Sequence, residues 1–544
     1  MTNEKPDDVN REVLAYDTTL RDGAQAVGVT FSAEDKLRVV EVLAGELGVH
    51  YVEAGWPGSN PTDDEVFDRL GELELGRTKV VAFGSTRGKG RACEDDRLLT
   101  ALVRAPVEDV ALVGKTWTLH VTSALGTTLE ENLAIISESV EFLVGRGKTV
   151  HFDAEHFFDG VRADRDYAFK CLAAALDAGA HSLVLCDTNG ATLPGAIGRV
   201  VADVADAFPE ALLGIHAHDD SGVAVANSLA AFEAGSTVVQ GTVNGIGERC
   251  GNANLLTVLA NLHLKLGVRV LPDGCLRNLT DVAKRVNAQL NLPPPATAPY
   301  VGTCAFTHKG GLHVSGIARD AATYEHVDPQ LVGNERDVAV SELSGRSTIL
   351  FKARQLGFAF DDDSPKVDRI LQVVKERQRD GYSFEGAEGS LELIIRSIDM
   401  NIDDPQFFRN KYFRIEGFRV HSSNIETYGT EATIRVVVRG KTFHTAAEGN
   451  GPVNAIDNAL RKALEHFYPS LRDIELTDFK VRIIKQAGTA SKVQVFARTR
   501  DGDRAWGTVG AHENIIIASW EALLDAYVYK LLKDNVAWAE RGYR

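Results

Sequence analysis

A regular alternation of short apolar runs and longer amphipathic runs, from Leu14 to about Leu266, most constrains the fold of this chain. The runs that read as strands are VLAYDTTL, YVEAGW, KVVAFG, DVALVG, TVHFDAEH, SLVLCDT, LLGIHAH and TVVQGTVNG. The runs between them are helix-like, and the run at 127–147 opens with Thr128 and Glu131 at the spacing of a capping box. Strand–helix units repeated in this way over roughly 250 residues predict a (β/α)₈ TIM barrel. A doubly wound open sheet is the main alternative, but no G-x-G-x-x-G motif follows the first strand.

The rest of the chain reads as two further parts. The prolines of NLPPPATAPYVG break the strand–helix rhythm after residue 290, and helix-like segments continue to about Ser390. The last part is rich in strands and contains an imperfect repeat, in which ATIRVVVRGKTFHTAAEGNGPVNAIDNALRKALEHF aligns with SKVQVFARTRDGDRAWGTVGAHENIIIASWEALLDAYVYKLL. We therefore expect a barrel domain at 1–290, helical linker subdomains at 291–400 and an α+β domain of two ββα units at 401–544.

Charge and cysteine usage exclude several classes of protein. The net charge of −17 argues against a nucleic-acid partner. The 6 cysteines form no C-x-x-C pair, which indicates reduced thiols rather than a disulfide framework or a cysteine zinc site. The first residues lack the apolar core of a signal peptide, and no run approaches about 18 apolar residues. We therefore expect a cytoplasmic protein without a membrane partner.

Two histidines in GIHAHDDSG end the seventh predicted strand. His216 and His218 are two residues apart, so on a strand they point the same way and can hold one cation. Asp22, in LRDGAQ, ends the first predicted strand, and barrel enzymes build their sites at the carboxyl ends of the strands. Two imidazoles and one carboxylate suit Mn²⁺, Zn²⁺, Fe²⁺ or Co²⁺, and Asn252 in GERCGN is a candidate for an additional oxygen ligand. The alternative interpretation is a pair of hydrogen-bonded structural histidines.

These motifs resemble the signatures of a known enzyme family. LRDGAQ followed by Lys36, together with LGIHAHDDSGVAVA, is similar to the paired signatures of the 2-isopropylmalate, homocitrate and citramalate synthases. The resemblance covers nearly the whole chain, through NGIGERCGN, GGLHVSG, SELSGRSTI and GNGPVNAIDNAL. Within the family, the long-branch citramalate synthases are most similar in GVHYVEAGWPGSNPTD, TYEHVDPQLVGNER and VGAHENIIIASW.

The resemblance implies a reaction and its cofactor. The family performs a Claisen-type condensation of acetyl-CoA with a 2-oxo acid, followed by thioester hydrolysis that releases CoA. In the citramalate branch the oxo acid is pyruvate, and the product, (R)-citramalate, feeds isoleucine synthesis. By motif position, the divalent metal is held by Asp22, His216, His218 and Asn252. Mn²⁺ is the first expectation for this metal, ahead of Mg²⁺, Zn²⁺ and Co²⁺.

The resemblance also assigns roles to residues at other strand ends and in the linker. Arg21 and Thr188 are expected to bind and polarise the oxo acid. The residues expected to act in catalysis are Arg21, Glu53, Glu155, His313 and Tyr324. The last two belong to the linker, which in the family often completes the site of a dimer partner. Where some relatives carry an acidic residue two positions after this histidine, the chain has Ser315.

The residues by themselves leave the choice of substrate open. Trp117, at the end of the fourth predicted strand, would narrow the pocket and favour pyruvate over a bulkier acid. A core or rim tryptophan is the equally weighted alternative. The choice of pyruvate therefore rests on the resemblance, and 2-isopropylmalate synthase is the second candidate.

The C-terminal repeat resembles the regulatory domain of these synthases. It is expected to form a homodimer and to bind a feedback amino acid, isoleucine, in loops that precede helices. A lyase or aldolase on the same barrel is a further alternative, although the simple lyases end soon after the barrel. The remaining alternative is a catalytically idle metabolite sensor, against which the intact set of Arg21, Asp22, His216 and His218 argues.

Overall fold

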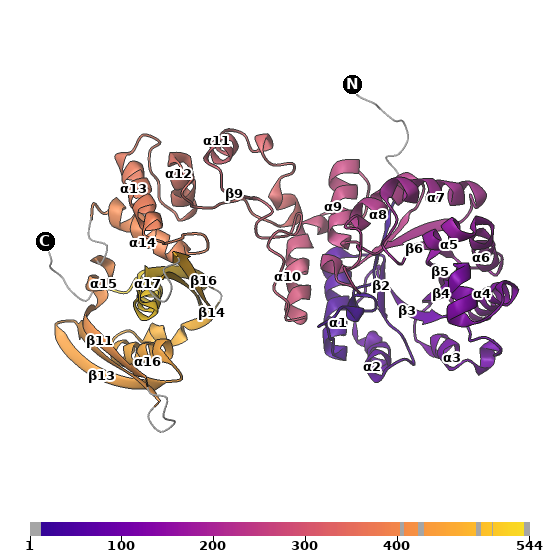
Figure 1. Ribbon diagram of the computed structural model, residues 1–544, viewed down its shortest axis with the longest axis horizontal. Helices are drawn as coiled ribbons and strands as arrows, with labels where there is room; N and C mark the ends of the chain where they lie inside the picture. The colour runs from indigo at the N-terminus through magenta and orange to yellow at the C-terminus, as the bar shows by residue number, and fades with distance from the viewer. Residues whose placement is uncertain (1–11, 403–406, 423–428, 486–490, 503, 538–544) are drawn as a thin grey trace. The chain divides into compact units, whose positions relative to one another are not determined.

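The computed structural model describes residues 12–402, 407–422, 429–485, 491–502 and 504–537 (Figure 1). The first 11 residues, on which the signal-peptide argument partly rests, lie outside the described residues. The chain forms two compact units, which we call the barrel unit and the C-terminal unit. The barrel unit holds the chain up to residue 306 together with residues 327–336, and the C-terminal unit holds residues 307–326 and 337–544.

The barrel unit contains a closed parallel barrel in which the strands follow one another in sequence order. The strands are β1 Leu14–Asp17, β2 Tyr51–Gly55, β3 Lys79–Ser85, β4 Asp109–Lys115, β5 Thr149–Glu155, β6 Ser182–Asp187, β7 Leu212–Ala217 and β8 Val238–Gly241. The barrel closes because β1 pairs with β8 as well as with β2. Every strand segment expected from the sequence is present, so the predicted (β/α)₈ barrel is confirmed.

Helices surround these strands (Figure 1). They are α1 Ala33–Val42, α2 Pro61–Arg69, α3 Arg97–Arg104, α4 Leu129–Val144, α5 Phe157–Ala163, α6 Arg165–Asp177, α7 Pro194–Ala207, α8 Ala224–Glu233, α9 Leu255–Leu266 and α10 Leu279–Gln289. Helix α4 begins where its cap was expected, because the hydroxyl of Thr128 accepts the backbone N–H of Glu131 at 3.1 Å. Among the described residues, no helix is long and apolar enough to cross a membrane.

The C-terminal unit begins with short helical elements. These are α11 Gly311–Arg319, α12 Arg346–Gln355, α13 Pro365–Arg379, α14 Glu388–Asp399 and α15 Phe407–Tyr412, with a small sheet of β9 Thr307–His308 and β10 Asp337–Val338. Apolar residues of α12, α13 and α14 share one buried cluster. A helical region after the barrel therefore exists, as the sequence indicated.

The internal repeat forms two antiparallel sheets, each followed by a helix (Figure 1). The first copy is β11 Arg414–Ser422, β12 Thr430–Val438, β13 Lys441–Gly449 and α16 Pro452–Leu464. The second copy is β14 Glu475–Lys485, β15 Lys492–Asp501, β16 Arg504–His512 and α17 Ile515–Lys533. Each copy is thus a βββα unit rather than the expected ββα unit. The additional strands, β11 and β14, alternate apolar residues such as Phe479, Val481 and Ile483 with charged ones, and the sequence argument did not use this alternation.

Candidate metal and substrate site

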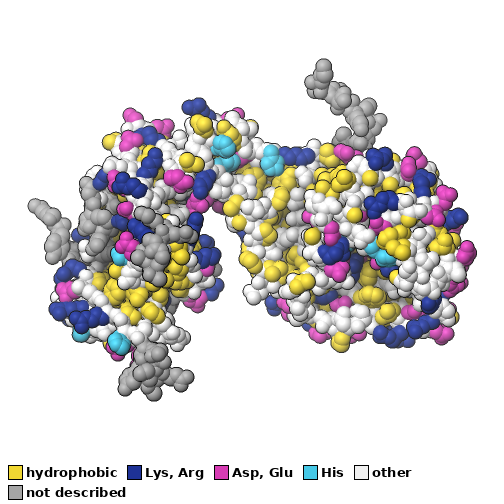
Figure 2. Space-filling model, viewed as in Figure 1, with side chains coloured by type: hydrophobic (Ala, Val, Ile, Leu, Met, Phe, Trp, Pro, Cys, Tyr) yellow, Lys and Arg dark blue, Asp and Glu magenta, His cyan; other side chains and the backbone are white. Residues whose placement is uncertain are grey.

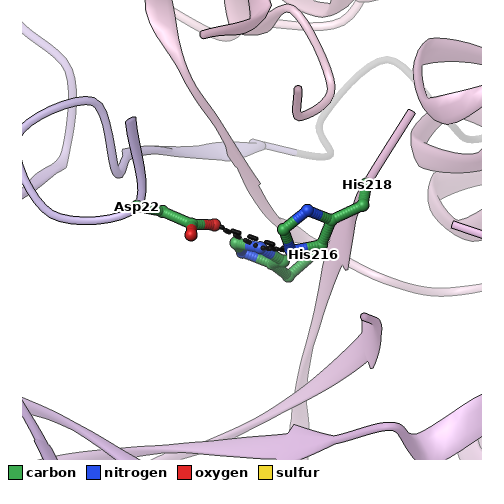
Figure 3. A group of neighbouring side chains, drawn as sticks. All are labelled: Asp22, His216 and His218. Carbon is green, nitrogen blue, oxygen red and sulfur yellow. Dashed lines mark hydrogen bonds and ion pairs between the residues drawn. The ribbon is translucent and has the colours of Figure 1, made fainter. Parts of the chain in front are cut away.

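The carboxyl ends of β1 and β7 bring Asp22, His216 and His218 together (Figure 3). The Nε2 atom of His216 lies 2.9 Å from Oδ2 of Asp22, and the Nε2 atom of His218 lies 3.7 Å from the same oxygen. The two Nε2 atoms are 3.3 Å apart. All three side chains are buried, and their ligand atoms lie within 4.8 Å of one another. Such a group is consistent with a divalent metal site.

A fourth side chain tests whether this group fits a metal ion. The amide nitrogen of Asn252 lies 2.6 Å from Oδ2 of Asp22 and 3.1 Å from Nε2 of His216, whereas its buried Oδ1 has no partner among the described residues. Amide nitrogen and oxygen exchange places when the group rotates by half a turn. That rotation would direct the oxygen at the same ligand atoms, so the donor set of two imidazoles, a carboxylate and an amide oxygen fits a divalent cation.

Electrostatics favours the metal-binding forms of Asp22 and His218, whereas at His216 burial lowers the pKa but Asp22 outweighs burial and raises it. Burial raises the pKa of the Asp22 carboxyl, but the Arg21 guanidinium and His216 outweigh it and hold this pKa well below its usual range. Burial and the neighbouring His216 lower the pKa of His218 to about 3. Asp22 is therefore a carboxylate and His218 a neutral imidazole at neutral pH, and metal ligation requires both forms.

Arg21 lies beside this group and is held by a buried carboxylate. Its Nε donates to Oε1 of Glu53, and Oε2 of Glu53 accepts the hydroxyl of Tyr16 at 2.8 Å. The guanidinium carbon also lies 3.9 Å from the centre of the Phe83 ring. Glu53 has 0 % exposure and both of its oxygens are engaged, so in this structure it orients Arg21.

A cavity of about 580 Å³ opens beside Arg21 and the histidines. Glu155 lines it and forms an ion pair with Lys115, which also lines it. Thr188 lines it too, and its hydroxyl oxygen accepts the backbone N–H of His156 at 2.9 Å. The cavity therefore brings together Arg21, Glu155 and Thr188, three of the barrel residues to which the sequence assigned substrate or catalytic roles.

Two aromatic residues that the sequence argument missed line the cavity, whereas Glu53 and Trp117, which were expected at the site, are not among its lining residues. Trp117 is not among the residues that line the cavity, and it stacks against His120 with ring centres 5.1 Å apart. The aromatic side chains of the wall are Trp56 and Phe83, which meet edge to face at 5.2 Å. The sequence argument gave neither Trp56 nor Phe83 a role in the pocket, although a large ring at the carboxyl end of a barrel strand is itself a signal.

The two linker residues expected to act in catalysis lie in the C-terminal unit. The rings of His313, on α11, and Tyr324 stack with centres 4.2 Å apart. Both side chains are exposed. Their contribution to the chemistry of the barrel stays a prediction.

Comparison with known proteins agrees with this architecture along the chain. Residues 12–286 match the HMGL-like family, residues 300–381 the homocitrate synthase post-HMGL domain-like family, and residues 386–531 the LeuA allosteric (dimerisation) domain. The chain belongs to the HMGL-like family.

Curated relatives define the branch of this family. An (R)-citramalate synthase of Aquifex aeolicus is 48% identical over 530 residues, covering 96% of this chain and 98% of the relative. An (R)-citramalate synthase of Streptomyces coelicolor is 46% identical over 529 residues, with the same coverage of 96% and 98%. A 2-isopropylmalate synthase of Nitrobacter winogradskyi is 31% identical over 538 residues, covering 97% of this chain and 96% of the relative. The expected membership of the citramalate branch is thus supported over almost the full length.

The metal site makes a direct prediction about binding. The full-length chain, stripped with a chelator, should bind about one Mn²⁺ ion per chain, and His218→Gln should weaken that binding by at least about 100-fold because a ligand is lost. Equilibrium dialysis with metal analysis measures both. His263→Gln is the matched control, because His263 lies on α9 and bonds the carbonyl of Val268 instead. Equal affinities of the wild type and His218→Gln would contradict the site.

Proposed function

We propose that this chain condenses acetyl-CoA with pyruvate to give (R)-citramalate and CoA, as a step of isoleucine synthesis. The observation that carries the proposal is the Asp22, His216 and His218 cluster beside Arg21. This cluster lies in a chain 48% identical over 530 residues to an (R)-citramalate synthase. The metal ion that we propose for it is Mn²⁺, held by Asp22, His216, His218 and the amide oxygen of Asn252.

Arg21 and Thr188 are the proposed substrate-binding residues of the barrel. A divalent ion bound here would act as a Lewis acid on the ketone of the oxo acid. The Nε of Arg21 is committed to Glu53 and its Nη1 to Asp22 at 3.3 Å, so we assign Nη2 to a substrate oxygen. Because the oxygen of Thr188 accepts the His156 N–H, its own hydrogen is free to point to the substrate carboxylate.

Carbon–carbon bond formation requires a base. The methyl group of acetyl-CoA must lose a proton, its carbon then bonds the ketone carbon of pyruvate, and the ketone oxygen takes up a proton. Water then attacks the thioester carbonyl and CoA leaves as the thiol. We assign the proton transfers to Glu155 with His313 and Tyr324, and we assign to Glu53 the orientation of Arg21.

The aromatic wall accounts for a preference for a small oxo acid. Trp56 and Phe83 line the cavity, and Phe83 also packs beneath the guanidinium of Arg21. A pocket closed by rigid rings rejects an isopropyl group by steric clash, which discriminates more strongly than a loss of contacts. We therefore assign to these two rings the role that the sequence argument gave to Trp117.

The choice of substrate is tested by CoA release from acetyl-CoA with Mn²⁺, followed with a thiol reagent. Pyruvate and 2-oxoisovalerate are offered in parallel, and we expect kcat/KM for pyruvate to be higher by at least about 10- to 200-fold. A preference for 2-oxoisovalerate would instead assign the chain to 2-isopropylmalate synthesis. Metal binding without release from either acid would favour the lyase or the sensor interpretation.

Two features of the C-terminal unit are evidence for a homodimer whose activity is regulated. Its match is to an allosteric dimerisation domain, and hydrophobic side chains are exposed on the face of this unit shown in Figure 2. Strand β14 exposes Leu476, Val481 and Ile483. We propose that two chains associate through this domain and that isoleucine is the amino acid it binds.

Regulation by isoleucine makes a separate prediction. Millimolar isoleucine should lower the rate of CoA release from acetyl-CoA and pyruvate, and leucine at the same concentration should lower it less. The readout is the steady-state rate, with a chain truncated after residue 400 as a probe of whether any effect needs the C-terminal sheets. An unchanged rate of the full-length chain in isoleucine would contradict this part of the proposal.

A further inference from the structure

A line of buried hydrogen bonds leads from His216 away from the metal-binding cluster. The Nδ1 atom of His216 lies 2.7 Å from Oε1 of Gln240, on the neighbouring strand β8. The Nε2 group of Gln240 donates to Oδ1 of Asp153, on β5, at 3.4 Å. Gln240 is completely buried, and Asp153 and His216 are 3 % and 5 % exposed. These residues therefore form a connected path inside the barrel.

The hydrogen-bonding chemistry gives this path a direction. A carboxylate only accepts hydrogen bonds, so Asp153 selects the NH₂ end of the Gln240 amide. The carbonyl end then faces His216, and because a carbonyl also only accepts, Nδ1 of His216 must carry the ring hydrogen. In the neutral ring that binds a cation, the lone pair is then on Nε2, the atom that a cation held between Asp22 and His218 would meet. The opposite orientation of the amide would place two acceptors against each other at Asp153.

His218, the second histidine of the cluster, has no comparable hydrogen bond among the described residues. The buried Nδ1 of His218 has no hydrogen-bond partner among the described residues. The two imidazoles of the cluster therefore differ, because the protein fixes the ring hydrogen of His216 and leaves that of His218 unassigned. Metal-ligating histidines commonly depend on a partner at the other ring nitrogen for orientation and affinity.

We infer that Gln240 and Asp153 are positioning residues that hold His216 in the tautomer and orientation that binds a divalent cation. This inference rests on the proposed metal-dependent function. It adds that the affinity of the site is set partly in the barrel interior, by two residues that do not touch the ion. His216 is then the pre-oriented ligand of the cluster.

Two variants break the path and a third restores it. Gln240→Met removes both hydrogen bonds at similar volume, and Asp153→Leu removes the acceptor that orients the amide. The double variant Asp153→Asn with Gln240→Glu exchanges the amide and the carboxylate. The carboxylate at position 240 still accepts the hydrogen of His216 Nδ1, and the amide at position 153 donates to that carboxylate. The matched control is Asn227→Leu, since Asn227 is also a buried barrel amide but bonds the carbonyl of Thr192.

The readout is the dissociation constant for Mn²⁺, obtained from the electron paramagnetic resonance signal of the free ion with no substrate present. Burial and Glu53 raise the pKa of Asp153 to about 7, so the titrations are done at about pH 8 to keep it charged. We expect Gln240→Met and Asp153→Leu each to weaken binding by about 10- to 100-fold. The double variant should bind nearly as the wild type does, and Asn227→Leu should not change the affinity.

The outcomes separate the inference from the function on which it rests. If the wild type binds Mn²⁺ and the two breaking variants bind it as tightly as Asn227→Leu does, the inference is overturned while the metal site stands. Equal weakening in the breaking and the double variants would overturn it as well, because a general packing defect would then explain the loss. A wild type that binds no divalent cation would instead overturn the proposed metal site.

Discussion

The contact between Asp22 and His216 is the interaction on which the rest of the site depends. It joins the carboxyl ends of β1 and β7, which are far apart in the sequence and meet only because the barrel closes through β8. The alternating strand directs His216 and His218 to the same side, and Asp22 lies opposite both. Arg21 precedes Asp22 directly in the chain, so the position of the proposed substrate-binding guanidinium is fixed by the same contact.

Buried charges of this kind are costly unless they have partners, and the barrel supplies those partners in two separate networks. Glu53 accepts a hydrogen bond from Arg21 and is itself held by the hydroxyl of Tyr16. Gln240 and Asp153 hold His216 through two others. Side chains inside the barrel therefore orient Arg21 and His216 at its rim. Their hydrogen bonds offset the cost of burying several ionisable groups and hold these groups in one arrangement.

Sequence reasoning recovered the barrel and the residues at its strand ends because both depend on local periodicity. The strand–helix alternation identified every barrel strand, and the His216 and His218 spacing identified one face of β7. It missed β11 and β14 because charged residues interrupt their apolar ones, as Lys480 and Arg482 do between Phe479, Val481 and Ile483, so neither strand forms a continuous apolar run. It also missed Gln240 and Asp153, since a single polar residue within a buried strand gains meaning only once its neighbours across the barrel are known.

The aromatic residues that line the cavity are a second example of what the sequence alone could not identify. Trp117 follows β4 and was a reasonable candidate for the pocket, but the chain turns there so that its ring packs on His120 instead. Trp56, directly after β2, and Phe83, within β3, line the cavity instead, and only the folded barrel shows which of these rings reaches it. The relation of His313 and Tyr324 to the barrel is likewise a question of how two units meet, which no local pattern encodes.

The central claim is that the buried cluster holds a metal ion that contacts both the histidines and the oxo acid. It is tested most directly by electron–nuclear double resonance of the Mn²⁺-loaded chain with pyruvate labelled with ¹⁷O. The account predicts ¹⁴N couplings from two imidazoles, together with a ¹⁷O coupling that appears only with the labelled acid. A bound Mn²⁺ ion without nitrogen couplings, or one whose spectrum is unchanged by labelled pyruvate, would contradict it.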